Sequence, residues 1–150
     1  MRPGDLAPDF TLPDDRGQVF TLSEALTRGR VVLFFFPAAM SRGCTKESCH
    51  FRDLANEFAA HRAQRVGISM DDVARQVRFA QSNALGYPLL SDHDGRVAAL
   101  YGVKRGIDLL RVKRATFVVG TDRTLIDVVT SEFSMQAHAD RALVALAARG

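Results

Sequence analysis

A continuous apolar segment, Val31–Phe36 (VVLFFF), stands out in the pattern of hydrophobic and polar positions. It contains no polar position, which is typical of a central strand with both faces buried. Apolar residues at helical spacing follow from about residue 44, and Arg65–Met70 (RVGISM) then predicts a second strand. The order strand, helix, strand predicts a parallel βαβ unit.

A second helix is expected after this unit, capped by Asp71 or Asp72 and running to about Ala84. A short extended segment then opens at Tyr87-Pro88. Helical spacing predicts that the apolar face of the second helix consists of four residues: Val73, Val77, Ala80 and Ala84.

The two ends of the chain are each predicted to hold a hairpin. Near the N-terminus, the turn residues 13–17 (PDDRG) separate two short strands, and Ser23 is expected to cap a brief helix. The second hairpin turns at residues 121–123 (TDR). The expected ranges are Phe10–Leu12 and Gln18–Thr21 for the first hairpin, Arg96–Tyr101 for an intervening helix, Ala115–Gly120 and Leu125–Ser131 for the second hairpin, and Gln136–Ala148 for a final helix.

These elements predict an α/β fold of the thioredoxin-like type, with a central mixed sheet flanked by helices and an N-terminal β-hairpin extension. A parallel βαβ half is followed by a ββα half, with one helix inserted between them. No linker, repeat or low-complexity segment interrupts the pattern. Residues 1–150 are therefore expected to form a single domain.

Composition adds little to this picture. The chain is 47% hydrophobic and 25% charged, and its net charge of +3 is spread along the sequence, so we expect a mixed-charge surface that binds neither nucleic acid nor membrane. The N-terminal residues MRPGDLAPDF contain prolines and acids where a secretory signal needs an apolar core. A cytoplasmic location is the expectation.

The two cysteines carry the candidate chemistry, and the first of them lies at the predicted start of a helix. Cys44 follows the apolar strand after a short loop of small and polar residues. Unpaired backbone N–H groups and the helix dipole favour negative charge at that position. We therefore expect the Cys44 thiol to ionise more readily than a free cysteine, which makes it a candidate nucleophile.

Helical spacing separates the two cysteines. At about 100° per residue, Cys49 lies roughly 140° around the helix from Cys44, so Cys44 faces inward and Cys49 does not. In an ideal helix residues five apart have Cα atoms roughly 8–9 Å apart, whereas a disulfide needs less than about 7 Å. If the two cysteines pair, the helix must unwind locally. The apolar stripe of Cys44 is expected to include Phe51, Leu54, Ala55 and Phe58.

Pro37, Ser41 and Cys44 follow the pattern P-x-x-x-S-x-x-C, and Arg114 begins the segment RATF. This combination resembles the peroxiredoxins, and Cys49 five residues after Cys44 resembles the bacterioferritin comigratory protein or peroxiredoxin Q subfamily. The resemblance extends from GDLAPDFTL through YPLLSDHDG and VAALYGV to RATFVV. It implies a thioredoxin-dependent thiol peroxidase that acts on hydrogen peroxide and organic hydroperoxides and needs no cofactor or metal.

The resemblance also implies a role for each residue of the motif. Cys44 would be the peroxidatic cysteine, and Arg114 would hold a positive charge beside its sulfur and bind the peroxide. Ser41 would accept from the backbone near the thiolate and donate to peroxide or sulfur, Pro37 would shield the site from water, and Glu47 would orient the arginine. Ser41 stands where threonine is commoner in the family.

The resemblance also implies a role for the second cysteine, Cys49. Oxidised Cys44 would become a sulfenic acid that condenses with Cys49 to an intramolecular disulfide. Thioredoxin or a related redoxin would then restore the reduced protein. The subfamily resemblance favours a monomer, with a dimer as the alternative.

Other interpretations of the same residues stay open at this point. Cys49 is either the resolving residue or a surface thiol without a role. A thiol–disulfide oxidoreductase is disfavoured because the spacing is C-x-x-x-x-C. A metal site of His50 and the two cysteines is disfavoured because these residues lack zinc spacing, whereas a redox-sensing module stays an alternative. The basic loop Lys104–Arg114 is either solvated or a docking surface for an acidic reductant.

Overall fold

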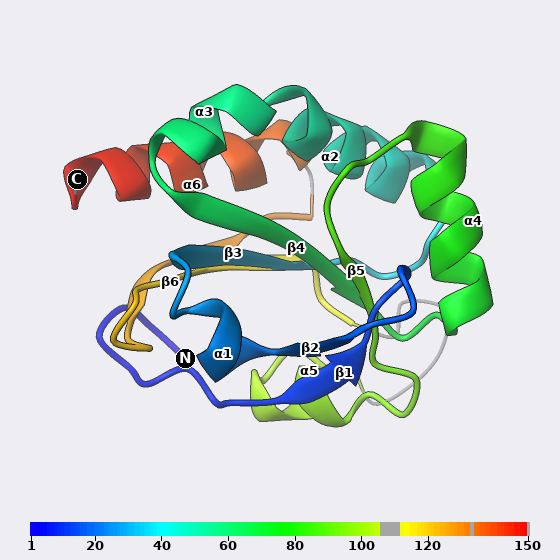
Figure 1. The fold of residues 1–150 in the computed structure, drawn as a ribbon, viewed down its shortest axis with the longest axis horizontal. Helices are drawn as coiled ribbons and strands as arrows, with labels where there is room; N and C mark the ends of the chain where they lie inside the picture. Colours follow the sequence, from blue (N-terminus) through cyan, green and yellow to red (C-terminus); the bar gives the residue numbers. More distant parts are fainter. Residues whose placement is uncertain (106–111, 133, 150) are drawn as a thin grey trace.

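A five-stranded mixed sheet forms the centre of the computed structural model, which describes residues 1–105, 112–132 and 134–149 (Figure 1). Its order is β5-β4-β3-β6-β7. β3 pairs with β4 and β4 with β5 in parallel, whereas β6 is antiparallel to both β3 and β7. The strands are β3 (Arg30–Phe35), β4 (Ala63–Ser69), β5 (Leu89–Ser91), β6 (Ala115–Val119) and β7 (Leu125–Thr130).

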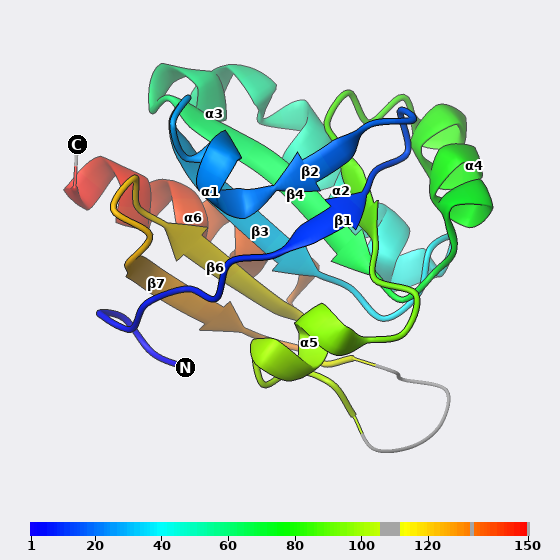
Figure 2. The same cartoon turned by 60° about the horizontal axis from the view of Figure 1, so that its bottom comes forward.

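Helices cover one face of this sheet, and an N-terminal hairpin with two short helices covers the other (Figures 1 and 2). The first layer holds α2 (Arg42–Asp53), α3 (Ala55–Ala60), α4 (Val73–Asn83) and α6 (Met135–Ala148). The second holds β1 (Thr11–Pro13), β2 (Val19–Thr21), α1 (Leu22–Ala25) and α5 (Arg96–Leu100). Within the described residues, no helix is both long and apolar enough to cross a bilayer.

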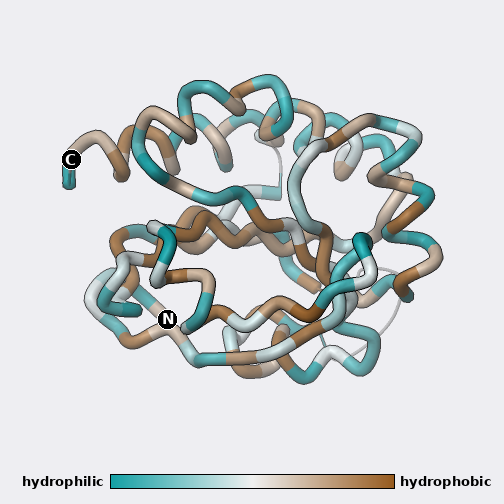
Figure 3. Tube along the Cα trace, viewed as in Figure 1, coloured by the Kyte–Doolittle hydropathy of each residue, from teal (hydrophilic) through white to brown (hydrophobic). Residues whose placement is uncertain are grey.

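The apolar segment after Arg30 is continuous because it contributes to two cores. Val31, Leu33 and Phe35 point into the core beneath the hairpin, while Val32, Phe34 and Phe36 point into the core beneath the helices. Successive side chains of a strand alternate between the two faces of a sheet, so a strand covered on both faces has no polar position. Figure 3 shows the resulting concentration of hydrophobic residues along the central strands.

The predicted fold class is confirmed: a mixed sheet is flanked by helices, and an N-terminal hairpin forms a separate two-stranded sheet. The parallel unit β3-α2/α3-β4 and the hairpin β6-β7 lie where the sequence predicts them. Asp72 caps α4 through a hydrogen bond from the backbone N–H of Arg75 at 2.9 Å.

Two expected helix details are wrong. The single helix expected from Cys44 through Phe58 ends at Asp53, and α3 begins after Leu54, whose φ and ψ of −98° and 23° are not helical. The side chain of Arg65 donates to the carbonyl oxygens of Phe51 at 2.9 Å and Arg52 at 3.4 Å, so the end of α2 is satisfied without a further turn. Ser23 lies inside α1 instead of capping it.

The buried face of α4 also differs from the expected one. Gln76 and Phe79 are its buried residues, whereas Val73 is 37% exposed. The amide of Gln76 donates to Ser69 Oγ at 2.9 Å and to the carbonyl of Leu90 at 2.7 Å. A polar side chain takes a core position here because its hydrogen bonds are made inside the protein, which hydrophobic spacing alone does not predict.

Gly67 in β4 is a position where the core leaves no room for a methyl group. A Cβ there would lie 2.8 Å from Leu89 Cδ2 and 3.0 Å from Phe34 Cζ. We expect Gly67→Ala to lower the free energy of unfolding by about 1–3 kcal/mol, because overpacking forces neighbouring side chains to move. Urea unfolding measures this change in stability. Gly86→Ala is not a suitable control, because Gly86 has a positive φ of 77° and a side chain there would itself cause strain. An unchanged urea midpoint for Gly67→Ala would contradict the packing described.

Candidate active site

Cys44 lies in the first turn of α2, fully buried, directly after the loop that follows β3. Ser41 is the N-cap of this helix, and its Oγ accepts a hydrogen bond from the backbone N–H of Cys44 at 3.3 Å. The same hydroxyl donates to the carbonyl oxygen of Ala38 at 3.0 Å. The cap fixes the start of the helix and therefore the position of the cysteine.

Arg114 reaches this cysteine from the other half of the chain. It directly precedes β6, which pairs with β3, and its Nη2 lies 3.2 Å from Cys44 Sγ. The arginine is only 6% exposed. The guanidinium also packs against Gly43, where a Cβ would lie in van der Waals contact with Nη2 at 3.4 Å. A permanent positive charge thus contacts the sulfur in a part of the protein that is shielded from water.

Glu47, one turn after Cys44, holds the other side of the guanidinium. Arg114 Nη1 donates to Glu47 Oε1 at 2.5 Å, and the carboxyl is fully buried. Burial raises the pKa of Glu47 to about 8, although the charge and hydrogen bond of Arg114 act against this shift. The backbone N–H of Arg114 donates to the carboxylate of Glu132 at 3.1 Å.

A buried histidine in α6 faces the second oxygen of Glu47, and hydrophobic patterning did not identify it. His138 Nε2 lies 2.8 Å from the carbonyl oxygen of Ser131, so this nitrogen carries a proton. Its Nδ1 lies 2.8 Å from Thr116 Oγ1 and 3.6 Å from Glu47 Oε2. Burial lowers the pKa of His138, and the neutral ring therefore accepts from Thr116.

The loop before Cys44 is held by Asp71, which precedes α4, and by Arg75 in α4, a second feature that sequence motifs missed. Asp71 Oδ2 accepts the backbone N–H of Ala39 at 2.7 Å, and Arg75 Nη2 donates to the carbonyl of Ala39 at 3.1 Å. Met40 has a φ of 69°, an uncommon conformation for a side chain other than glycine. Pro37 is buried at the end of β3, where the chain leaves the sheet.

Cys49 lies in the same helix, partly buried, and both cysteines are free thiols. Its Sγ donates to Asn83 Oδ1 at 3.6 Å, and α2 is continuous through both cysteines. Neighbouring His50 pairs with Asp140 at 2.8 Å. The predicted separation of the two thiols on one helix is therefore present in the reduced protein.

The structure brings together Cys44, Ser41, Glu47 and Arg114, four of the six residues that the sequence singled out. The expected bond from the backbone to Ser41 is present, but the Ser41 hydroxyl donates to a carbonyl and not to the sulfur. The catalytic roles of these residues stay predictions. Most of the basic loop, residues 106–111, lies outside the described residues, so its expected docking role is untested.

The pKa of Glu47 predicts a pH-dependent stability. The unfolded carboxyl titrates near 4.5 and the folded one near 8, so between these values the folded state keeps a proton that the unfolded state has lost. The free energy of unfolding should therefore fall as the pH rises from about 5 to 8, by on the order of a few kcal/mol. Glu47→Gln should remove this contribution, which urea unfolding at pH 5, 6.5 and 8 would show.

Glu57→Gln is the matched control, because Glu57 is an exposed carboxylate of α3. Its pH dependence should follow that of the native protein. Because the pKa of His138 is lowered, its contribution to the free energy of unfolding increases with pH below about 6.5, opposite to that of Glu47. Comparing the variants with the native protein cancels this contribution. Parallel curves for the native protein and Glu47→Gln would show that Glu47 titrates normally.

Comparison with known proteins gives a family match over most of the chain. Residues 3–128 match the model of the AhpC/TSA family. Peroxiredoxin Q of Arabidopsis thaliana chloroplasts is 36% identical over 140 residues, which cover 93% of this chain and 64% of that protein.

Similar solved structures include two bacterial proteins. Peroxidoxin BcpB of Mycobacterium tuberculosis is 59% identical, with a TM-score of 0.95 over 99% of this chain and 97% of that one. The bacterioferritin comigratory protein of Xanthomonas campestris, whose structures concern its alkyl peroxide reduction activity, is 27% identical, with a TM-score of 0.85 over 93% of this chain and 91% of that one.

Proposed function

The chain belongs to the AhpC/TSA family and is a peroxiredoxin, a thiol-dependent peroxidase, and we propose that Cys44 is the residue that reacts with the hydroperoxide. One observation carries this assignment. The buried sulfur of Cys44 lies at the start of α2 and contacts the guanidinium of Arg114 at 3.2 Å. Helix terminus and arginine together favour a thiolate at this position.

In the first step the Cys44 thiolate attacks the terminal oxygen of the hydroperoxide. A sulfur–oxygen bond forms, the O–O bond breaks, and the leaving oxygen takes a proton and departs as water or an alcohol. Cys44 is oxidised to the sulfenic acid, and the peroxide is reduced. The donors of Arg114 stabilise the negative charge that grows on the leaving oxygen.

Glu47 positions Arg114 for this step. Its Oε1 accepts from Arg114 Nη1, which leaves Nη2 directed at the sulfur. Burial raises the pKa of Glu47, which lessens the negative charge that this carboxyl places beside Arg114. The positive charge then acts on the sulfur and on the peroxide.

In the second step Cys49 attacks the sulfenic sulfur of Cys44. The disulfide forms, the S–O bond breaks, and the hydroxyl leaves as water. Because α2 is helical from Arg42 to Asp53, the segment between the two cysteines must unwind for their sulfurs to meet. The hydrogen bond from Cys49 to Asn83 breaks in that movement.

A dithiol then reduces the disulfide, and thioredoxin or a related redoxin fits this role. The bacterioferritin comigratory protein of Xanthomonas campestris is described by its alkyl peroxide reduction activity, which favours organic hydroperoxides beside hydrogen peroxide as substrates of this chain. The protein acts as a monomer in this proposal, with its active site formed within one chain.

Sustained turnover tests the proposal. The reduced protein is mixed with hydrogen peroxide or tert-butyl hydroperoxide in the presence of thioredoxin, thioredoxin reductase and NADPH, and NADPH oxidation is followed. Continuous oxidation that needs both protein and hydroperoxide is the expected result. Oxidation of the protein no faster than that of a free thiol, with no NADPH consumption for thioredoxin or glutaredoxin, would reject the proposal.

A further inference from the structure

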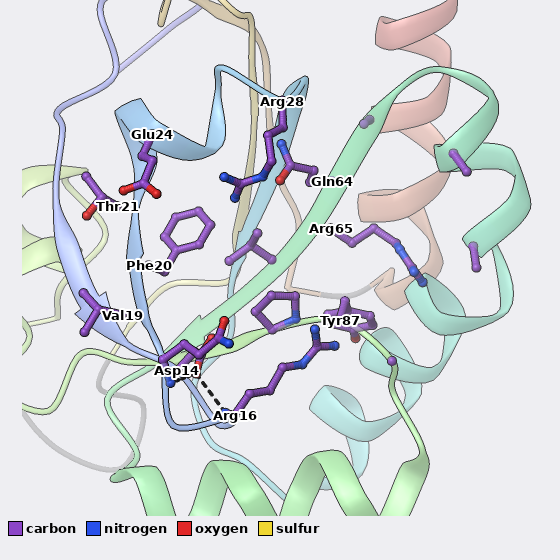
Figure 4. A pocket seen from close by; sticks show the side chains of 17 residues that line it. Asp14, Arg16, Val19, Phe20, Thr21, Glu24, Arg28, Gln64, Arg65 and Tyr87 are labelled. Atoms are coloured by element: carbon purple, nitrogen blue, oxygen red, sulfur yellow. Dashed lines mark hydrogen bonds between the residues drawn. The ribbon is translucent and has the colours of Figure 1, made fainter.

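A cavity of about 370 Å³ lies between the N-terminal hairpin and the first half of β4, away from Cys44 (Figure 4). Only the second half of β4 pairs with β5, so residues 63–66 line the cavity at an edge of the sheet. Its volume falls in the range of small-molecule sites. Its other walls come from residues 18–21 of the hairpin, from Ala55 and Ala59 of α3, and from Gly86, Tyr87 and Pro88.

Three arginines line this cavity without a carboxylate partner. Among the residues that the structure describes, Arg16, Arg28 and Arg65 form no ion pair. Asp14 also lines the cavity, but its Oδ1 accepts the backbone N–H groups of Arg16 at 2.8 Å and Gln18 at 2.9 Å. With Glu24, two carboxylates face three guanidinium groups. The cavity therefore has an excess of positive charge.

The guanidinium groups stand at two ends of the cavity. Figure 4 shows Arg28 beside Gln64 at one end, and Arg16 with Arg65 beside Tyr87 at the other. Burial lowers the pKa of Arg65, and the charge of Arg16 lowers it further, so the two cations repel each other. An anion between them would relieve this repulsion.

We propose that this cavity binds a small organic dianion whose two carboxylate or phosphate groups contact Arg28 at one end and Arg16 with Arg65 at the other. Guanidinium groups bind both kinds of oxyanion through paired hydrogen bonds. The middle of the ligand lies against the apolar side chains of Ala59, Ala63 and Val66.

The wall of this site is bonded to the helix that carries both cysteines. Tyr87 Oη donates to the carbonyl of Ser48 at 2.7 Å, and Arg65 Nη1 donates to the carbonyl of Phe51 at 2.9 Å. The Arg65 guanidinium also lies over the Tyr87 ring, 5.0 Å from its centroid. The Tyr87 bond holds its part of the wall in place only while α2 is helical at Ser48, next to Cys49.

Ligand binding is therefore coupled to the state of the cysteines, a step that rests on the proposed disulfide. Unwinding of the segment between Cys44 and Cys49 frees Tyr87 from the carbonyl of Ser48 and so loosens the wall on which Arg65 is stacked. The dianion should bind more tightly to the reduced protein than to the disulfide form. By reciprocity, the bound dianion slows or disfavours disulfide formation.

Isothermal titration of the reduced protein with succinate and with propane-1,3-bisphosphonate tests the site, with acetate at equal ionic strength as the monovalent comparison. Saturable binding of at least one dianion probe, and none of acetate, is expected. Arg16→Gln combined with Arg28→Gln should weaken binding about tenfold or more. Succinate and the bisphosphonate distinguish a preference for carboxylate from a preference for phosphate.

Arg78→Gln is the matched control, because Arg78 is an exposed arginine of α4 outside the cavity. It should leave the affinity unchanged. Binding that falls equally in Arg78→Gln and the double variant, or that does not saturate, would overturn the site by showing a general effect of surface charge. Circular dichroism of the double variant shows whether it is folded, so that loss of folding is not mistaken for loss of the site.

The coupling is tested by repeating the titration with the protein oxidised to the Cys44–Cys49 disulfide. We expect the affinity to fall by about fivefold or more. Equal affinity for the two forms would overturn the coupling. Mass spectrometry of the oxidised sample shows whether the disulfide forms at all, so a failure of the proposed function is recognised separately.

Discussion

Replacing Cys44 with serine is expected to abolish hydroperoxide consumption, whereas Cys49→Ser should leave the first oxidation intact. A serine hydroxyl beside Arg114 cannot supply the nucleophile, because its oxygen stays protonated where a thiol ionises. Without Cys49, the sulfenic acid on Cys44 has no thiol partner in the chain, which contains two cysteines. Mass spectrometry after peroxide treatment should show one added oxygen on Cys44 of Cys49→Ser and a disulfide in the native protein.

Circular dichroism of both variants controls for folding, since Cys44 is buried in the core and Cys49 is only partly buried. Sulfenate that accumulates on Cys44 in the native protein as strongly as in Cys49→Ser would contradict the resolving role. Peroxide consumption that survives in Cys44→Ser and is lost in Cys49→Ser would show that Cys49, and not Cys44, is the cysteine that reacts with peroxide.

Arg114→Lys is expected to slow the oxidation of Cys44 by about 10- to 100-fold. Lysine keeps the positive charge, but one ammonium group cannot bond to Glu47 Oε1 and Cys44 Sγ in the geometry of the two guanidinium nitrogens. The peroxide then loses fixed donors as its O–O bond breaks. The second-order rate constant with hydrogen peroxide, measured in the Cys49→Ser background, gives the size of the effect.

Arg30→Lys is the control for this substitution. Arg30 is also partly buried and donates to the carbonyls of Leu146 and His61, but it lies at the start of β3, far along the strand from the loop that carries Cys44. It should keep the native rate constant. An unchanged rate constant in Arg114→Lys, or an equal loss in Arg30→Lys, would show that the geometry of Arg114 has no part in the first step.

Most of the fold could be predicted because it follows from local patterns. The fully apolar Val31–Phe36 indicates a strand with two buried faces, and Asp72 is a recognisable cap for the helix that follows β4. The buried face of α4 could not be predicted in the same way. Gln76 occupies it through hydrogen bonds to Ser69 and Leu90, and spacing of apolar residues contains no information on such partners.

The candidate site shows the same division. Cys44 and Ser41 are three residues apart in the sequence, and a helix start with a capping serine places them together. Arg114 and Glu47 required the family resemblance, since their contact joins residues that only the pairing of β3 with β6 brings close. His138 was not predicted, because a single histidine in an alanine-rich helix gives no sign that it faces a carboxylate.

The central claim is that the Cys44 sulfur, beside Arg114, is built to break an O–O bond. The most direct test is the second-order rate constant for oxidation of Cys44 by hydrogen peroxide in Cys49→Ser. Because the chain has no tryptophan, rapid quenching and mass spectrometry are the suitable readout. A rate constant at least about 10³-fold above that of free cysteine at the same pH is predicted. A rate constant equal to that of free cysteine would contradict it.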